Sequence, residues 1–123
     1  MVLPRFDYSS YLDLARELAL CGSSHPLSQA KWRSSVSRSY YAAFLHGMHY
    51  NSNPEISHRD LIDWLQRQDR DLARDLRSLK TFREDCDYDH PIDYDLSAKA
   101  QECVDTAVGI IEGLRARFDA PRS

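Results

Sequence analysis

The chain has 123 residues, the size of a single domain, and 42% of them are hydrophobic, which is enough for one core. A formal net charge of −3 gives no general attraction for nucleic acid or an anionic membrane, so such contacts would need a local basic patch. There is no signal peptide and no apolar run approaching a membrane span, so we expect a cytoplasmic protein. Cys21, Cys86 and Cys103 are an odd set in apolar stretches, which predicts reduced, buried thiols.

The first two predicted helices cover residues 10–21 and 27–50. The apolar side of the first is expected to contain Tyr11, Leu14, Ala15 and Leu18. Gly22 suits the end of that helix. The second helix is the longest and carries apolar and aromatic residues on most of its sides, so it is predicted to be the central helix of a bundle.

A third helix is predicted after Ser57, with Ser57 as its N-cap and Asp60 in the capping-box position. Its buried side is expected to contain Leu61, Trp64 and Leu65. Around residues 66–70 the pattern is compatible either with a bend or with the start of a fourth helix.

Two more helices complete the chain. One ends near Cys86, and the other covers residues 96–118 with the clearest apolar stripe in the sequence. Pro91 separates them. We therefore predict an all-α, antiparallel up-and-down bundle of four or five helices in one domain of residues 1–123, with frayed ends at 1–7 and 119–123.

Arg83 interrupts the apolar stripe of the helix that ends near Cys86, where another leucine would be expected. Burying a guanidinium requires anionic or hydrogen-bonding partners. Asp87 lies one helical turn later and Tyr88 follows it. Arg38 and Tyr41 share one strip of the second helix. These residues form either an internal structural clamp, in which Arg83 or Arg38 pairs with Asp87, or part of a binding site.

Arginines also form a ridge opposite the leucine stripe, made of Arg67, Arg70, Arg74 and Arg77. Acidic residues flank this ridge, which favours a solvated, salt-bridged helix face over a phosphate-binding one. The sequence contains no glycine-rich phosphate loop, nucleophile elbow or paired-cysteine site. His46 and His49 lack a matching pair of ligands, so we expect no metal and no cofactor.

Two short motifs resemble those of HEPN domains, small all-α modules associated with nucleotides and RNA. Residues 37–44, SRSYYAAF, are similar to the second-helix signature of that family. Residues 79–88, LKTFREDCDY, are similar to the later signature, an arginine followed four residues on by an Asp-Tyr pair. Both motifs occur in the expected order at a plausible separation, and the predicted bundle covers essentially the whole chain.

The resemblance implies a dimeric helical bundle. Many HEPN proteins are metal-independent endoribonucleases of toxin–antitoxin or defence systems, with an Arg and a His separated by four to six residues, and Arg83 and His90 match that pattern. Cleavage of RNA requires proton transfer, suited to a histidine, and positive charge on the phosphate, suited to an arginine. The resemblance also implies a homodimer that brings both sets to one cleft and a cognate antitoxin or nucleotidyltransferase partner.

The alternative is a non-catalytic HEPN module. Members that carry the Asp-Tyr pair without the histidine bind nucleotides, RNA or partner proteins. In this chain the binding residues would be Arg38, Tyr41, Asp87 and Tyr88, around Arg83. His90 would then be an ordinary loop residue.

Overall fold

The computed structural model describes residues 9–88 and 91–119, and in these residues the chain forms five α-helices and no strand. The helices are α1 (Ser9–Ala19), α2 (Ser28–Asn51), α3 (His58–Gln68), α4 (Arg70–Asp87) and α5 (Leu96–Phe118). The predicted all-α bundle is confirmed. The ends predicted to fray lie outside the described residues except for Asp119, which accepts a hydrogen bond from Tyr50 Oη at 2.7 Å.

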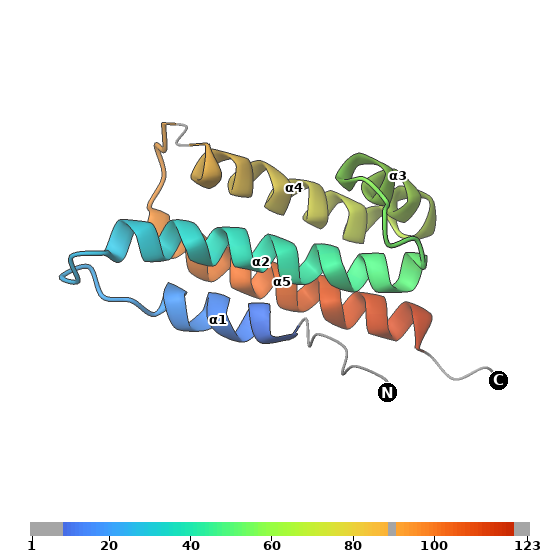
Figure 1. Ribbon diagram of the computed structural model, residues 1–123, viewed down its shortest axis with the longest axis horizontal. Helices are drawn as coiled ribbons and strands as arrows, with labels where there is room; N and C mark the ends of the chain where they lie inside the picture. The colour runs from blue at the N-terminus through green and yellow to red at the C-terminus, as the bar shows by residue number, and fades with distance from the viewer. Residues whose placement is uncertain (1–8, 89–90, 120–123) are drawn as a thin grey trace.

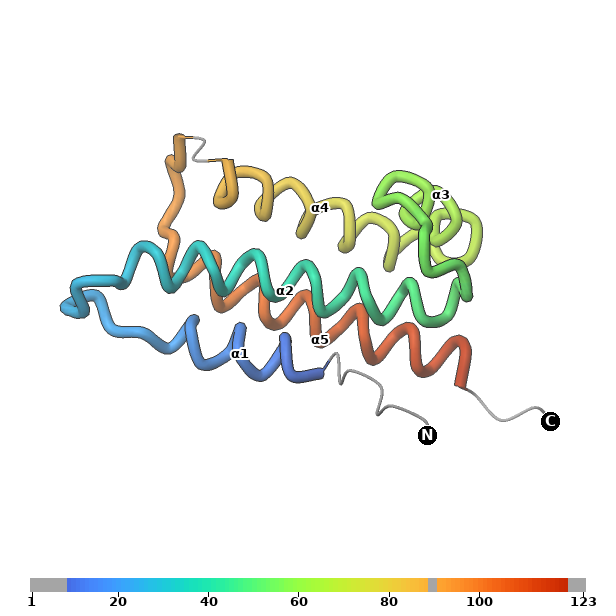
Figure 2. Tube along the Cα trace, viewed as in Figure 1, coloured from blue at the N-terminus to red at the C-terminus, as the bar shows by residue number. Residues whose placement is uncertain are grey.

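Helices α2 and α5 lie side by side in the middle of the molecule, with α1 on one side of them and α4 on the other (Figure 1). Successive long helices run in opposite directions, and short α3 lies across the N-terminal end of α4 (Figure 2). Helix α2 packs against all four others, as its apolar residues on most sides predicted.

Side-chain caps set several of the helix boundaries. Ser57 accepts a hydrogen bond from the Asp60 backbone N–H at 3.1 Å, which confirms the predicted N-cap of α3. Around residues 66–70, where the sequence is compatible with a bend or with a fourth helix, the chain begins a fourth helix at Asp69. The backbone of Asp69 is extended, with a φ of −160°, and its carboxylate accepts from the N–H groups of Asp71 and Leu72, so a new helix begins there. Asp95 caps α5 in the same way, through the Ala98 N–H.

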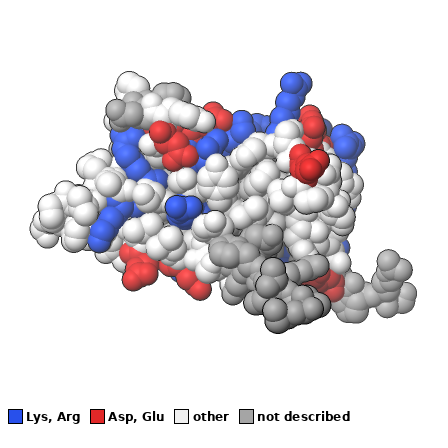
Figure 3. Space-filling model, viewed as in Figure 1, with Lys and Arg blue, Asp and Glu red and all other residues white. Residues whose placement is uncertain are grey.

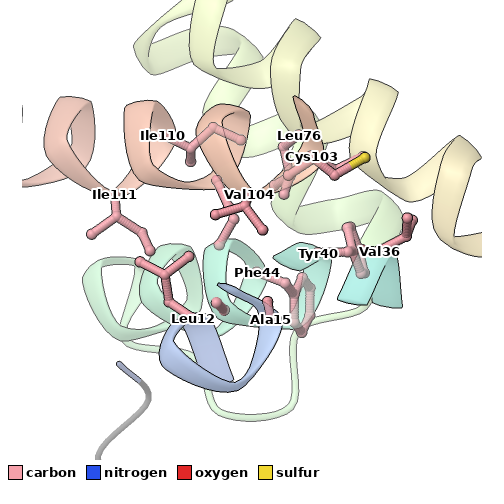
Figure 4. Close-up of a cluster of buried hydrophobic side chains, with 14 of the residues drawn as sticks. Leu12, Ala15, Val36, Tyr40, Phe44, Leu76, Cys103, Val104, Ile110 and Ile111 are labelled. Carbon is pink, nitrogen blue, oxygen red and sulfur yellow. The ribbon is translucent and has the colours of Figure 1, made fainter. Parts of the chain in front are cut away.

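The core contains side chains from every helix, and Figure 4 shows those of α1, α2, α4 and α5 converging. The stripe of α4 is buried as predicted, including Arg83. The stripe of α5 is also buried, except for Phe118 at its end. Phe118 stacks between Tyr50 of α2 and Trp64 of α3, with ring centroids 5.2 and 5.5 Å away. Trp64, predicted to be buried, is only partly covered, and the buried side of α3 consists of Leu61, Ile62 and Leu65.

The predicted buried side of α1 is wrong in part. The core residues of this helix are Leu12, Ala15 and Ala19, whereas Leu14 is 39% exposed. The physical reason is that leucines occur on several sides of this short helix, so periodicity alone does not choose its orientation. The helix also ends at Ala19, before Gly22, and no described glycine has a positive φ.

The cysteines are free thiols, as predicted, although Cys21 is only half-buried. Burial raises the pKa of Cys86 to about 11 and that of Cys103 to about 12, so both remain protonated. Among the described helices, none is long and apolar enough to cross a membrane.

Candidate functional site

Arg83 is buried in the interface between α4 and α2, with 9% of its surface exposed. Its Nη1 donates to the Tyr41 hydroxyl and to Asp87 Oδ2, both at 3.2 Å. The side chain of Asp87 is 33% exposed, so this ion pair lies at the boundary between the core and the solvent. Burial lowers the pKa of Arg83, but Tyr41 and Asp87 outweigh burial and raise the pKa overall. Arg83 is therefore a permanent cation with an anionic partner.

Three tyrosine rings surround the guanidinium of Arg83. The Arg83 Cζ atom lies 5.4 Å from the ring centroid of Tyr40, 5.5 Å from that of Tyr41 and 5.8 Å from that of Tyr88. Such contacts are favourable because the faces of aromatic rings carry partial negative charge. Tyr88 is 63% exposed, so it presents an aromatic surface to solvent directly beside the buried cation.

Two further polar side chains of α2, Arg33 and Ser37, bind the C-terminal end of α4. Arg33 Nη1 donates to the carbonyl oxygens of Asp85 and Cys86 at 3.4 and 3.2 Å. A cation at this position also complements the negative end of the helix dipole. Ser37, one turn later on α2, donates to Asp87 Oδ2 at 3.4 Å. Asp87 is thus fixed by both helices, and the pair Asp87–Tyr88 has a defined position at the end of α4.

A histidine that the sequence analysis did not single out lies next to this cluster. Tyr40 Oη and His58 Nδ1 are 2.5 Å apart. Burial raises the pKa of Tyr40, so its phenol keeps its proton, and His58 is its only partner among the described residues. We therefore assign Tyr40 as the donor and His58 as the neutral tautomer with its proton on Nε2. The imidazole also stacks on Phe44, with centroids 4.2 Å apart.

The pKa of His58 is lowered from 6.5, first by burial and then by the positive charges of Arg83 and Lys80, with Glu84 acting in the opposite direction. No local pattern pointed to this residue, since it simply follows the Ser57 cap. Its partners Tyr40 and Phe44 lie on another helix.

The structure brings together Tyr41, Arg83, Asp87 and Tyr88, but it does not bring Arg38 into this group. The guanidinium of Arg38 lies over the ring of Tyr11 in α1, with Cζ 5.4 Å from the centroid. Arg38 thus contacts α1, and its predicted role in binding stays a prediction. His90 lies outside the described residues.

The described residues contain one buried donor at this site without a partner. Arg83 Nε makes no hydrogen bond to any part of the chain that the structure describes. In the same residues, no three His, Cys, Asp or Glu side chains come together as metal ligands would. His46 Nδ1 donates locally to the Ala42 carbonyl oxygen, 2.6 Å away, and His49 is exposed.

No family model matches this chain, and no curated protein or solved structure matches it either. The resemblance to HEPN domains therefore depends on the two sequence motifs. Their residues meet in space at the Arg83 cluster, which joins Tyr41 of the first motif to Asp87 of the second.

Proposed function

We propose that this protein is a HEPN-like module that binds a nucleotide or RNA at the Asp87–Tyr88 edge, with Arg83 as its structural support rather than a catalytic group. The observation that carries the proposal is the contrast in exposure at this site. The Arg83 side chain is 11% exposed and already engages Tyr41 and Asp87, whereas the adjacent Tyr88 is 63% exposed.

The chemistry of the edge suits a base and a ribose. An exposed tyrosine ring is a stacking platform for a nucleobase, and such stacking contributes about 1–3 kcal/mol per base. The Asp87 carboxylate can accept hydrogen bonds from ribose hydroxyls or from an exocyclic amine. Its charge is partly offset by Arg83 at 3.2 Å, which reduces the repulsion of a phosphate-bearing ligand.

Calorimetry with mononucleotides and short single-stranded RNAs tests this proposal. Tyr88→Ala is expected to weaken binding about 5- to 150-fold, the equivalent of the lost stacking. Tyr88→Phe should retain binding because it keeps the ring. Leu20→Ser, at another exposed apolar residue, should bind like the wild type. Equal affinities for the wild type and Tyr88→Ala would refute the proposal.

The competing proposal is the metal-independent ribonuclease with Arg83 and His90 as its catalytic pair. What supports it is the Arg-to-His spacing in the sequence. The test is RNA cleavage in EDTA by the wild type and by His90→Ala. Cleavage that disappears in His90→Ala would establish the enzyme and overturn the non-catalytic proposal. The homodimer and the cognate antitoxin or nucleotidyltransferase partner remain predictions from the resemblance.

A further inference from the structure

A groove between α3 and α4 has three cations among its six lining residues. Its volume is about 260 Å³, and its lining consists of Arg59, Ile62, Asp63, Arg77, Lys80 and Thr81. Three of these residues are positively charged and one is negatively charged, although the whole chain has a net charge of −3. Figure 3 shows basic side chains along the edge formed by α4 and α3, with acidic ones among them.

The arginines of this groove differ from the neighbouring Arg74 in whether a carboxylate pairs with them. Arg74, on the outer side of α4, lies 3.4 Å from Asp71 and 3.5 Å from Asp75. Arg77 instead donates to the neutral Oε1 of Gln66 at 3.4 Å. Among the residues that the structure describes, neither Arg77 nor Arg59 makes an ion pair. Their charges thus remain available to an anion.

Lys80 connects the groove to the Arg83 cluster. It pairs with Glu84 at 2.8 Å, and Glu84 lies next to Arg83 in the sequence. Residues Arg77, Thr81, Glu84 and Tyr88 follow one another at spacings of four, three and four, so they share one side of α4. Eight residues at a rise of 1.5 Å separate Lys80 from Tyr88 by about 12 Å. A short oligonucleotide spans this distance, whereas a single phosphate does not.

We infer that the α3–α4 groove holds backbone phosphates of a single-stranded RNA whose base stacks on Tyr88. The groove is smaller than the usual site of a whole ligand, about 300–1,000 Å³, and therefore suits a phosphate group of a longer molecule. Arginine is well matched to this role because its planar fork binds phosphate oxygens bidentately. This inference rests on the proposed function for the position of the base.

The test measures affinity for a single-stranded hexanucleotide RNA over a range of salt concentrations. The double variant Arg59→Gln/Arg77→Gln is expected to bind about tenfold more weakly, since it loses two charge-assisted contacts. For single strands the slope of log K against log salt is about −0.7 per phosphate contact, so the slope should become less steep by about 1.4. The control Arg74→Gln removes another exposed charge from the same helix and should change neither quantity.

The outcomes separate this inference from the proposed function. If mononucleotides bind through Tyr88 but the double variant keeps the wild-type affinity and salt slope for RNA, the groove inference is wrong and the proposed function remains. If the double variant loses affinity while Tyr88→Ala does not, the groove binds phosphates as inferred, but the stacking of a base on Tyr88, and with it the proposed function, is wrong. Binding of inorganic phosphate to the groove without binding of RNA would overturn the inference.

Discussion

At the scale of single residues, Arg83 determines whether the central cluster is a clamp or an open site. Sequence analysis identified Arg83, Asp87, Tyr88 and Tyr41, because a charge within an apolar stripe is visible in the pattern. It grouped Arg38 with these residues, whereas the structure places Arg38 over Tyr11, and it overlooked His58. Both differences have the same cause. Tertiary packing decides which side of α2 contacts α1 and which side contacts the start of α3, and helical spacing does not encode that choice.

Replacement of Arg83 by alanine should destabilise the protein by about 2–3 kcal/mol. The variant loses a charge-assisted bond to Asp87 and the contacts with three tyrosine rings. The expected loss is below the roughly 3–5 kcal/mol of a fully buried pair, because the Asp87 side chain is 33% exposed and stays hydrated. Thermal unfolding should show a drop in Tm of about 10 °C.

Arg77→Ala is the matched control for this experiment, since Arg77 is an exposed arginine of the same helix. We expect its Tm to lie within about 2 °C of the wild type. A wild-type Tm for Arg83→Ala would contradict the clamp and would favour a solvated Arg83.

The His58–Tyr40 pair predicts a pH dependence of stability. The pKa of His58 is lowered in the folded state, so the unfolded state binds the proton more tightly. The stabilisation is therefore fully present above the ordinary pKa of 6.5 and is lost as the pH falls below it. Urea unfolding at pH 7.5 and pH 5 should show a lower free energy of unfolding at pH 5.

His58→Gln should reduce this difference between the two pH values, because the glutamine Oε1 can accept a hydrogen bond from the Tyr40 hydroxyl but the side chain does not titrate. The control is His49→Gln, which replaces an exposed histidine near the C-terminal end of α2. An undiminished difference in His58→Gln would assign the pH dependence to other groups.

At the scale of helices, caps and apolar stripes were sufficient to predict most boundaries. The bounds of α5 agree with the sequence prediction at both ends, and those of α2 differ by one residue at each end. The bounds of α5 follow local signals, namely its single apolar stripe and the Asp95 cap, whereas α2 has no side-chain cap at its N-terminal end and its bounds follow from the loops on either side of it. Helix α1 was less predictable because its leucines fit more than one orientation, and the choice is made by α2 and α5.

Two glycines of α5 offer a matched test of helix packing. A Cβ at Gly109 would meet nothing within 4 Å, whereas a Cβ at Gly113 would lie 2.6 Å from Leu72 Cδ2 of α4. Gly109→Ala should therefore stabilise the protein by about 0.5–1 kcal/mol through helix propensity alone. Gly113→Ala should gain less, or nothing, because the Leu72 side chain must move.

Denaturant midpoints of the two variants check this prediction directly. The slope m should stay constant in both, since neither substitution changes the surface exposed on unfolding. Equal stabilisation by the two alanines would show that α4 and α5 are less closely packed at Gly113 than the structure indicates.

At the scale of the whole molecule, the helices differ in how many neighbours support them. Helix α2 packs against every other helix, and α5 packs against α1, α2 and α4. Helix α3 has 11 residues and packs on α4 and, less extensively, on α2. It contacts α5 through Trp64, which stacks on Phe118 with the ring centroids 5.5 Å apart. Local opening is expected where few buried contacts hold an element.

We therefore predict an order of amide hydrogen exchange in which α2 and α5 exchange last, close to the free energy of global unfolding, and α3 exchanges first among the helices. Exchange followed by mass spectrometry of peptides from each helix measures this order. Trp64→Ala should speed exchange in α3 and leave the middle of α5 little changed, because the stack involves only the end of α5 at Phe118. Uniform exchange in all five helices would mean that the bundle opens as one cooperative unit. In that case α3 would be as rigid as the core that carries Arg83. The same would hold for His58 and Arg59, which lie at the start of α3, and Arg59 lines the proposed phosphate groove.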